Sequence, residues 1–177
     1  MYFIRFPLVL FRLFLVYVLQ ASFGPISYDV SGTLILAQPH YFCSPQSDFN
    51  ATGKVVLLRR GNCSFVDKVM NAQDLGAIGA IVGNNPDEEP ELVRMAYEFG
   101  FDPESVKIPS LFVSYLTFTT LVDIMSSASD PVIVEMNTEG EVFTDLFYVD
   151  MTAGYILLTH TLGAQDCPYS KSPVFAK

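Results

Sequence analysis

The segment Lys54–Asn85 constrains the fold of this chain more than any other part of its 177 residues. An apolar run typical of a strand (Val55–Leu58) leads through a basic turn (Arg59–Gly61) into a helical pattern, and a second apolar run (Ala77–Val82) follows. This order predicts a strand–helix–strand unit of the length that a parallel crossover needs. The segment has no phosphate-cradling glycine set, no metal-ligand pair and no nucleophile beside a base. We therefore expect it to support a surface and not to perform a reaction.

The helix of this unit has recognisable signals at both ends. Ser64 is in the N-cap position, and Asp67 follows at the position that completes a capping box. Apolar residues at helical spacing from Phe65 form one face, and Gly76 is typical of a helix C-terminus. The helix is therefore expected to run to about Leu75.

The rest of the chain alternates between strand and helix patterns. Further strands are expected over Val30–Ala37, Ile108–Val113 and Pro131–Met136, a short helical turn over Glu91–Glu98, and a second helix over Tyr115–Ser127 after Ser114 as N-cap. This alternation predicts one compact α/β domain over residues 28–137. Residues 138–177 form a C-terminal tail of uncertain structure.

The first 24 residues have the pattern of a secretory signal peptide. Arg5 precedes an apolar stretch, Phe6–Leu19, and small residues follow at Ala21–Gly24. We expect cleavage between Ala21 and Gly24, although Arg12 interrupts the apolar stretch and an uncleaved membrane anchor is the alternative. The predicted location is the lumen of the secretory pathway, either extracellular or vacuolar and endosomal.

Charge argues against a nucleic-acid partner. Residues 1–24 carry two arginines and no acidic residue, so 8 basic and 19 acidic side chains remain without them, a net charge of −11. Arg59-Arg60 is the one adjacent basic pair, whereas phosphate binding needs clustered basic side chains.

Cysteine usage agrees with an oxidising compartment. A bridge between Cys43 and Cys63 would close a loop of about 20 residues and stabilise the fold by about 3 kcal/mol. Cys167 would then be a free thiol, an intermolecular partner or part of a chain end foreign to the domain. The three cysteines and two distant histidines show no metal-ligand spacing, so neither a metal nor a cofactor is expected. Sequons at Asn50 and Asn62 are candidate glycosylation sites.

Several short motifs in the chain carry a family resemblance. They are Val56–Phe65 (VLLRRGNCSF), Lys68, Asn71–Gln73, Gly76-Ala77, Gly79–Val82, Asn84-Asn85 and Ile108–Ser110. In this order and spacing they resemble a protease-associated (PA) domain, the lumenal module of vacuolar sorting receptors, membrane-anchored RING ubiquitin ligases, some intramembrane aspartyl proteases and several secreted peptidases. The resemblance implies a mixed sheet or open barrel with flanking helices, and a non-catalytic domain that binds peptides or proteins or covers a protease active site.

The candidate binding residues lie in predicted loops, where sequence variation costs little stability. They are Arg59, Arg60, Asp87, Glu88 and Glu89, with the loops Pro39–Ser47 and Asn84–Asp102 as their surroundings. The acidic loop is either a solvated surface, a selector of basic peptides or a loose calcium site, and it lacks the D-x-D-x-D-G spacing of a calcium loop. We expect a protein or peptide ligand on the lumenal side.

The chain shows neither a protease motif nor the Cys/His ladder of a RING domain, so we expect no catalytic residue and no enzyme activity. Two functional hypotheses remain: a lumenal binding domain, or the truncated lumenal accessory domain of a RING ubiquitin ligase or a peptidase. Membrane attachment would then come only through the N-terminal segment or a missing C-terminal span. A purely structural secreted protein is a third reading.

Overall fold

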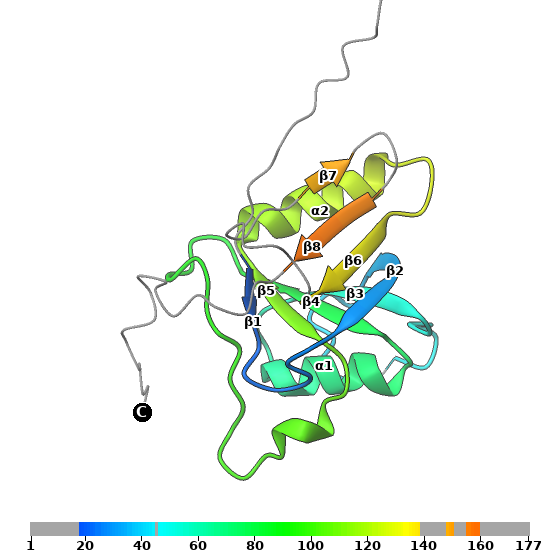
Figure 1. Ribbon diagram of the computed structural model, residues 1–177. Coiled ribbons are helices and arrows are strands. Elements are labelled where there is room, and N and C mark those ends of the chain that lie inside the picture. Colours follow the sequence, from blue (N-terminus) through cyan, green and yellow to red (C-terminus); the bar gives the residue numbers. More distant parts are fainter. Residues whose placement is uncertain (1–17, 45, 139–147, 151–154, 160–177) are drawn as a thin grey trace, which may run out of the picture.

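The computed structural model describes residues 18–44, 46–138, 148–150 and 155–159. An eight-stranded sheet has the order β1-β5-β4-β3-β2-β6-β8-β7, and two helices pack against it (Figure 1). The elements are β1 Val18–Gln20, β2 Asp29–Leu36, β3 Lys54–Arg59, α1 Phe65–Asp74, β4 Gly79–Gly83, the 3-10 turn η1 Pro103–Ser105, β5 Ser110–Val113, α2 Tyr115–Ser127, β6 Ile133–Asn137, β7 Tyr148–Asp150 and β8 Tyr155–Thr159.

Four parallel strands, β2, β3, β4 and β5, form the middle of the sheet. The predicted crossover is confirmed: β3 and β4 are parallel neighbours, paired from Val55 with Gly79 to Arg59 with Gly83, and α1 connects them. β1 and β6 join this parallel core in antiparallel orientation, so the sheet is mixed.

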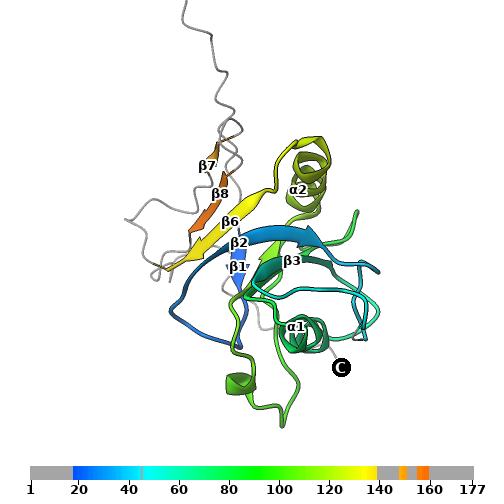
Figure 2. The ribbon, with the colours of Figure 1, turned by 90° about the vertical axis from the view of Figure 1, so that its right-hand side faces the viewer.

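Each face of the sheet buries its own core, and the two helices cover opposite faces (Figure 2). Along β3, Val56 and Leu58 pack in the cluster that contains the buried residues of α1, whereas Val55 and Leu57 pack in the cluster that contains Phe118 of α2. Side chains alternate between the faces of a strand. A strand that is covered on both faces therefore appears in the sequence as a continuous apolar run.

The ends of α1 are set by the residues that the sequence predicts. The Ser64 hydroxyl accepts from the Asp67 amide at 3.1 Å, and the Asp67 carboxylate accepts from the Ser64 amide at 3.3 Å, so the capping box is complete. Gly76 follows the helix with φ +85°, a conformation that favours glycine. At the start of α2, the Ser114 hydroxyl accepts from the Thr117 amide at 3.1 Å and caps the helix.

The folded part of the chain extends beyond both predicted limits, residues 28 and 137. At the N-terminus, β1 pairs with β5, the Ala21 amide donates to the Ser110 carbonyl at 3.0 Å, and Phe23 is buried. Cleavage between Ala21 and Gly24 would therefore remove a strand of the sheet; the cleavage itself stays a prediction, and residues 1–17 lie outside the described residues. At the C-terminus, β8 adds to β6 in parallel orientation and β7 follows it.

The predicted helical turn at Glu91–Glu98 is wrong. This segment is not helical, and the 3-10 turn lies instead at Pro103–Ser105. The reason is a contact with the N-terminal segment: the Met95 carbonyl accepts from both the amide and the hydroxyl of Ser22, at 2.9 and 3.0 Å, and Met95 is fully buried. In the part of the chain that the structure describes, neither helix has the length and apolar character that crossing a bilayer requires.

Candidate functional site

Three parallel strands end side by side at one edge of the sheet. Arg59 ends β3, Gly83 ends β4 and Val113 ends β5, and these three residues are paired in register. In open α/β sheets, ligands bind outside the carboxyl ends of the strands. The side chains that gather here are called the carboxyl-edge site: Arg59, Arg60, Asn84, Asn85, Glu88 and Tyr115.

Arg60 is the centre of this site. Its guanidinium Nη1 donates to the Asn84 side-chain oxygen at 2.9 Å and forms an ion pair with Glu88 Oε2 at 2.7 Å. Asn85 Nδ2 donates to the other carboxylate oxygen of Glu88, at 2.8 Å. One carboxylate is therefore held by a guanidinium on one oxygen and by an amide on the other.

Arg59 extends the site toward α2. Its Nε donates to the Asn85 side-chain oxygen at 3.1 Å, and its guanidinium carbon lies 5.7 Å from the centre of the Tyr115 ring. This is within the range of a cation–π contact. Beside Tyr115, Leu116 exposes 71% of its surface, so an apolar side chain borders the polar ones.

Asn84 organises the acidic loop, and the sequence reasoning did not assign it a role at the site. It is almost fully buried, and its Nδ2 points to the carbonyls of Glu88, Pro90 and Glu91 at 3.0 to 3.3 Å. The loop therefore folds back over the end of β4 and brings Glu88 to Arg60. Two consecutive asparagines at a strand end were the available signal.

The five predicted binding residues divide into two groups. Arg59, Arg60 and Glu88 come together in the carboxyl-edge site, whereas Asp87 and Glu89 are exposed and form no hydrogen bond or ion pair within the described residues. Asp87 has φ +58° at the tip of the loop. The described ranges contain no group of three His, Cys, Asp or Glu side chains arranged to hold a metal ion, so nothing in this loop supports the calcium reading.

The predicted disulfide between Cys43 and Cys63 is present and lies next to the site. It joins the loop that follows β2 to the turn that follows β3. A Cβ on Gly61, which has φ +109°, would lie 3.3 Å from the Tyr41 ring and 3.6 Å from Asn85 Nδ2. The bridged turn therefore packs between Tyr41 and the carboxyl-edge site. Cys167 lies outside the described residues.

Beneath the bridge lies Lys68, a fully buried lysine of α1. Its ammonium donates to the carbonyls of Tyr41 and of Gly61, the latter at 2.6 Å, and lies 5.5 Å from the centre of the Tyr41 ring. Burial lowers the pKa of Lys68 to about 8, against an opposing effect of the Asp67 carboxylate. Hydropathy alone predicts an exposed lysine. The burial of Lys68 could not be predicted, because its partners are backbone carbonyls and every residue type carries one.

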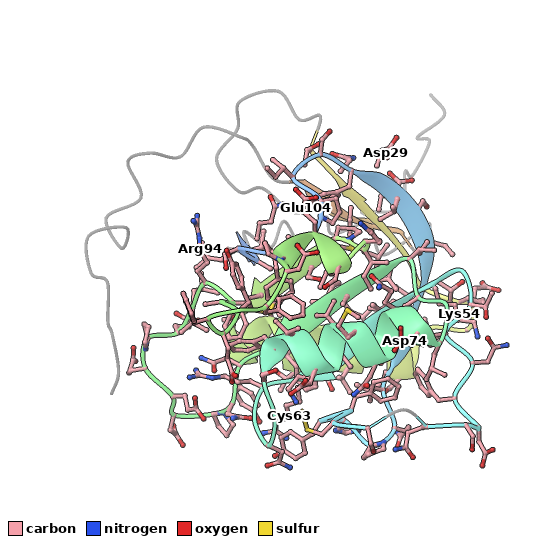
Figure 3. All side chains as sticks on the ribbon, turned by 90° about the horizontal axis from the view of Figure 1, so that it is seen from below. Asp29, Lys54, Cys63, Asp74, Arg94 and Glu104 are labelled. Atoms are coloured by element: carbon pink, nitrogen blue, oxygen red, sulfur yellow. A yellow bond between two sulfur atoms is a disulfide. The ribbon has the colours of Figure 1, made fainter. Side chains whose placement is uncertain are left out.

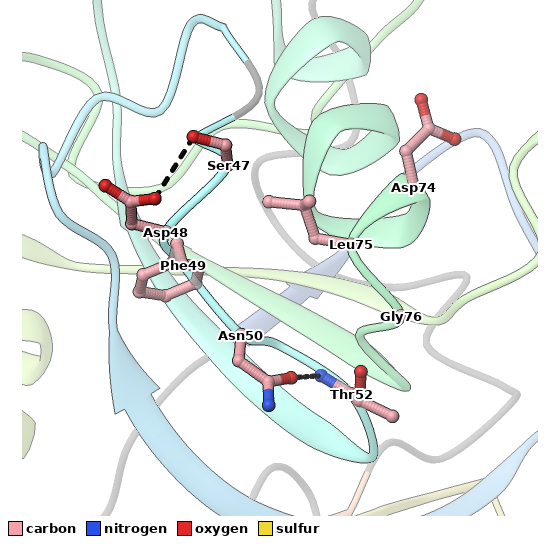
Figure 4. A pocket seen from close by; sticks show the side chains of 8 residues that line it. All are labelled: Ser47, Asp48, Phe49, Asn50, Thr52, Asp74, Leu75 and Gly76. Carbon is pink, nitrogen blue, oxygen red and sulfur yellow. Dashed lines mark hydrogen bonds between the residues drawn. The ribbon is translucent and has the colours of Figure 1, made fainter.

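A shallow depression of about 440 Å³ lies away from this site, at the C-terminal end of α1 (Figure 4). Figure 3 labels Asp74, the last residue of α1, and Lys54, the first residue of β3. The depression is lined by Ser47, Asp48, Phe49, Asn50, Thr52, Asp74, Leu75 and Gly76. Its rim contains the sequon residue Asn50, whose side-chain oxygen accepts from the Thr52 amide at 3.0 Å. Asn50 and Asn62 are both exposed, and glycosylation at either stays a prediction.

Comparisons with known proteins identify the family of the chain. The PA domain family model matches residues 30–121. The chain is 37% identical over 91 residues to the human ER degradation-enhancing alpha-mannosidase-like protein 3, an alignment that covers 48% of this chain and 10% of that protein. It is 35% identical over 112 residues to the Arabidopsis thaliana receptor homology region, transmembrane domain- and RING domain-containing protein 1, covering 54% of this chain and 34% of that protein. The chain thus spans about a third or less of these relatives.

Among solved structures, an aminopeptidase from Aneurinibacillus sp. strain AM-1 has a TM-score of 0.51 and 21% identity, covering 66% of this chain and 26% of that one. This likeness concerns the fold alone. The expected α/β fold, a mixed sheet with flanking helices, is confirmed by the strand order and by this neighbour. By the family match over residues 30–121 and by this fold, the chain belongs to the PA domain family.

Proposed function

We propose that this chain is a non-catalytic binding domain that holds a protein or peptide ligand in the lumen of the secretory pathway, with the carboxyl-edge site as its contact surface. The observation that carries the proposal is the way in which the site holds the carboxylate of Glu88. The guanidinium of Arg60 and the amide of Asn85 bind one oxygen each, and this pair suits a carboxylate from another chain equally well.

The surroundings of the pair suit an extended peptide. Tyr115 and Leu116 at the start of α2 offer an aromatic ring and an exposed apolar side chain, and Tyr41 borders the opposite side of the turn. A ligand with an acidic group flanked by apolar side chains would contact both kinds of surface. Aromatic and arginine side chains are also the ones that contribute most to binding energy at protein interfaces.

The lumenal location is supported by two observations. The Cys43–Cys63 disulfide is typical of an oxidising compartment, and the N-terminal residues have the signal-peptide pattern described above. An extracellular, vacuolar or endosomal destination is compatible with both observations.

A peptide library displayed on phage, selected on the full chain, tests this proposal. Peptides selected by the unmodified protein should bind the Arg60→Gln variant at least about tenfold more weakly, because the charged partner of their carboxylate is lost. The matched control is Lys54→Gln, which removes a cation from the start of β3, the strand that Arg60 directly follows, and should change the affinity less than about twofold. Selected peptides that bind Arg60→Gln and the unmodified protein equally would contradict the proposed surface.

A second candidate function is supported by the Arabidopsis relative, whose name includes a transmembrane domain and a RING domain. Under this alternative the chain corresponds to the lumenal accessory domain of a membrane-anchored RING ubiquitin ligase. The accessory domain of a peptidase is the other possibility of this kind. Sequencing the full-length transcript through the region that encodes Glu139–Lys177 distinguishes them. A continuous reading frame into an apolar 20-residue segment and a Cys/His ladder supports the ligase, and a protease motif supports the peptidase.

A further inference from the structure

The Cys43–Cys63 disulfide lies against a buried positive charge. Lys68 Nζ is 3.4 Å from the sulfur of Cys63 and 3.7 Å from the sulfur of Cys43. Across the described ranges, the one ion pair is that between Arg60 and Glu88, so no carboxylate neutralises Lys68 by direct contact. The groups that face its ammonium are two backbone carbonyls, the Tyr41 ring and the two sulfurs, and the Asp67 carboxylate acts on it as an opposite charge.

The two sulfurs differ in their surroundings. Cys43 is exposed, whereas Cys63 is partly buried and closer to the ammonium. A thiolate arriving from solvent therefore reaches Cys43 first, and Cys63 is then the leaving group. A neighbouring lysine lowers the pKa of a cysteine thiol, and a leaving thiol of lower pKa departs faster.

We propose that Cys43–Cys63 is a redox-active disulfide that exchanges with dithiol reductants, with Cys43 as the attacked sulfur and Cys63 as the leaving thiolate. A thiolate of the reductant attacks Cys43 Sγ, the bond between the two sulfurs breaks, and Cys63 Sγ takes the electron pair beside the Lys68 ammonium. The second thiol of the reductant loses its proton to solvent and attacks the reductant's own sulfur in the mixed disulfide. Cys43 leaves as a thiolate that takes up a proton, and the reductant becomes a disulfide.

Exchange at this position acts on the carboxyl-edge site. The bridge ties the loop that carries Tyr41 to the turn that directly follows Arg60. The bonds from Lys68 to the carbonyls of Tyr41 and Gly61 join the same two segments, so they hold the turn in part when the bridge is reduced. The reactivity of the bridge does not depend on whether a ligand binds at that site.

Two measurements on the full chain with Cys167→Ser test the proposal. In the first, the oxidised protein is exposed briefly to glutathione, quenched with acid and mapped by mass spectrometry. Glutathione should be attached to Cys43 in at least about tenfold excess over Cys63. An equal distribution, or a preference for Cys63, would overturn the assignment of the attacked sulfur.

In the second, the rate of reduction by dithiothreitol at pH 7 is compared among charge variants. Lys68→Met should slow the reaction by at least about tenfold, and Lys68→Arg should retain most of the rate, because the cation and not the packing assists the leaving thiolate. Circular dichroism checks that each variant is folded. If Lys68→Met does not fold, the Cys43→Ser chain gives the decisive value: the pKa of its Cys63 thiol, from absorbance at 240 nm, should lie below the ordinary value of about 8.5. A value at or above 8.5 would overturn the proposal.

Discussion

Replacing Gly83 with alanine should destabilise the domain far more than the same change at Gly79, although both glycines lie on β4. A Cβ on Gly83 would lie 2.4 Å from Cβ and Cδ2 of Phe118 and 2.5 Å from its Cγ. A Cβ on Gly79 would meet the Met136 sulfur at 2.9 Å and other side-chain carbons at 3.6 Å. The two positions therefore differ in which atoms must yield, and not in backbone conformation.

The expected magnitude follows from what each neighbour can do. Non-bonded carbons prefer separations of about 3.5 to 4.0 Å, so Phe118 must retreat by about 1 Å or more. Its Cβ is fixed to the helix backbone, so a change of rotamer does not suffice and α2 itself has to move, which disturbs the buried Phe118 and Leu121. Overpacking of this kind costs about 1 to 3 kcal/mol, and we expect Gly83→Ala to lower the free energy of unfolding by about 3 kcal/mol. The thioether of Met136 can rotate away, so Gly79→Ala should cost less than about 1 kcal/mol.

Urea unfolding followed by circular dichroism measures both variants; the chain has no tryptophan to serve as a fluorescence probe. Gly83→Ala should also weaken ligand binding, because α2 carries Tyr115 at the carboxyl-edge site. Both variants make the same change from glycine to alanine in one strand, so its effect on the entropy of the unfolded chain is the same in each. The contacts of the new methyl group are the remaining difference, and equal unfolding free energies for the two variants would refute the reasoning.

Four further predictions concern the buried side chains of Tyr28 and Lys68 and the predicted glycosylation of Asn50. The Tyr28 hydroxyl is buried and has no hydrogen-bond partner within the residues described, so Tyr28→Phe should raise the free energy of unfolding by about 1 kcal/mol in urea titrations. Burial also raises the Tyr28 pKa from 10.0 to about 12, so the unfolded chain loses this proton at lower pH than the folded one. The free energy of unfolding should therefore fall as the pH rises from 10 to 12, and Tyr28→Phe should lack this decrease. Burial instead lowers the pKa of Lys68 from 10.5 to about 8, so between these pH values the unfolded chain binds one proton more than the folded chain. The free energy of unfolding should therefore rise from pH 8 to 9.5 in the unmodified protein, and Lys68→Met should lack this rise. Asn50→Gln should remove one N-glycan from chain secreted by eukaryotic cells, visible as a discrete loss of mass.

Sequence reasoning succeeded where the determining contacts are local. Ser64 and Asp67 are three residues apart and their capping box is complete, and the apolar run Val55–Leu58 correctly indicated a strand. The disulfide was predictable because the cysteine count and the secretory pattern left few alternatives.

It failed where the determining contacts are distant or involve the backbone. β1 was hidden because two of its three residues, Val18 and Leu19, are the last residues of the apolar stretch in the signal-peptide pattern. The pairing of Glu88 with Arg60 depends on three backbone carbonyls bound by Asn84. Periodicity and composition carry no information on such bonds, so the role of Asn84 and the burial of Lys68 emerge only in three dimensions.

The position of β1 has a consequence for processing and solubility. β5 lies between β4 and β1, so the backbone of Ser110–Val113 is covered on its outer side by three residues from near the start of the chain. Proteolysis after Ala21 would uncover that side and leave an unprotected strand edge, which is a template for pairing with another chain. The position of the cut would then decide whether β1 keeps the β5 edge covered or leaves it open to an extended segment of a second polypeptide.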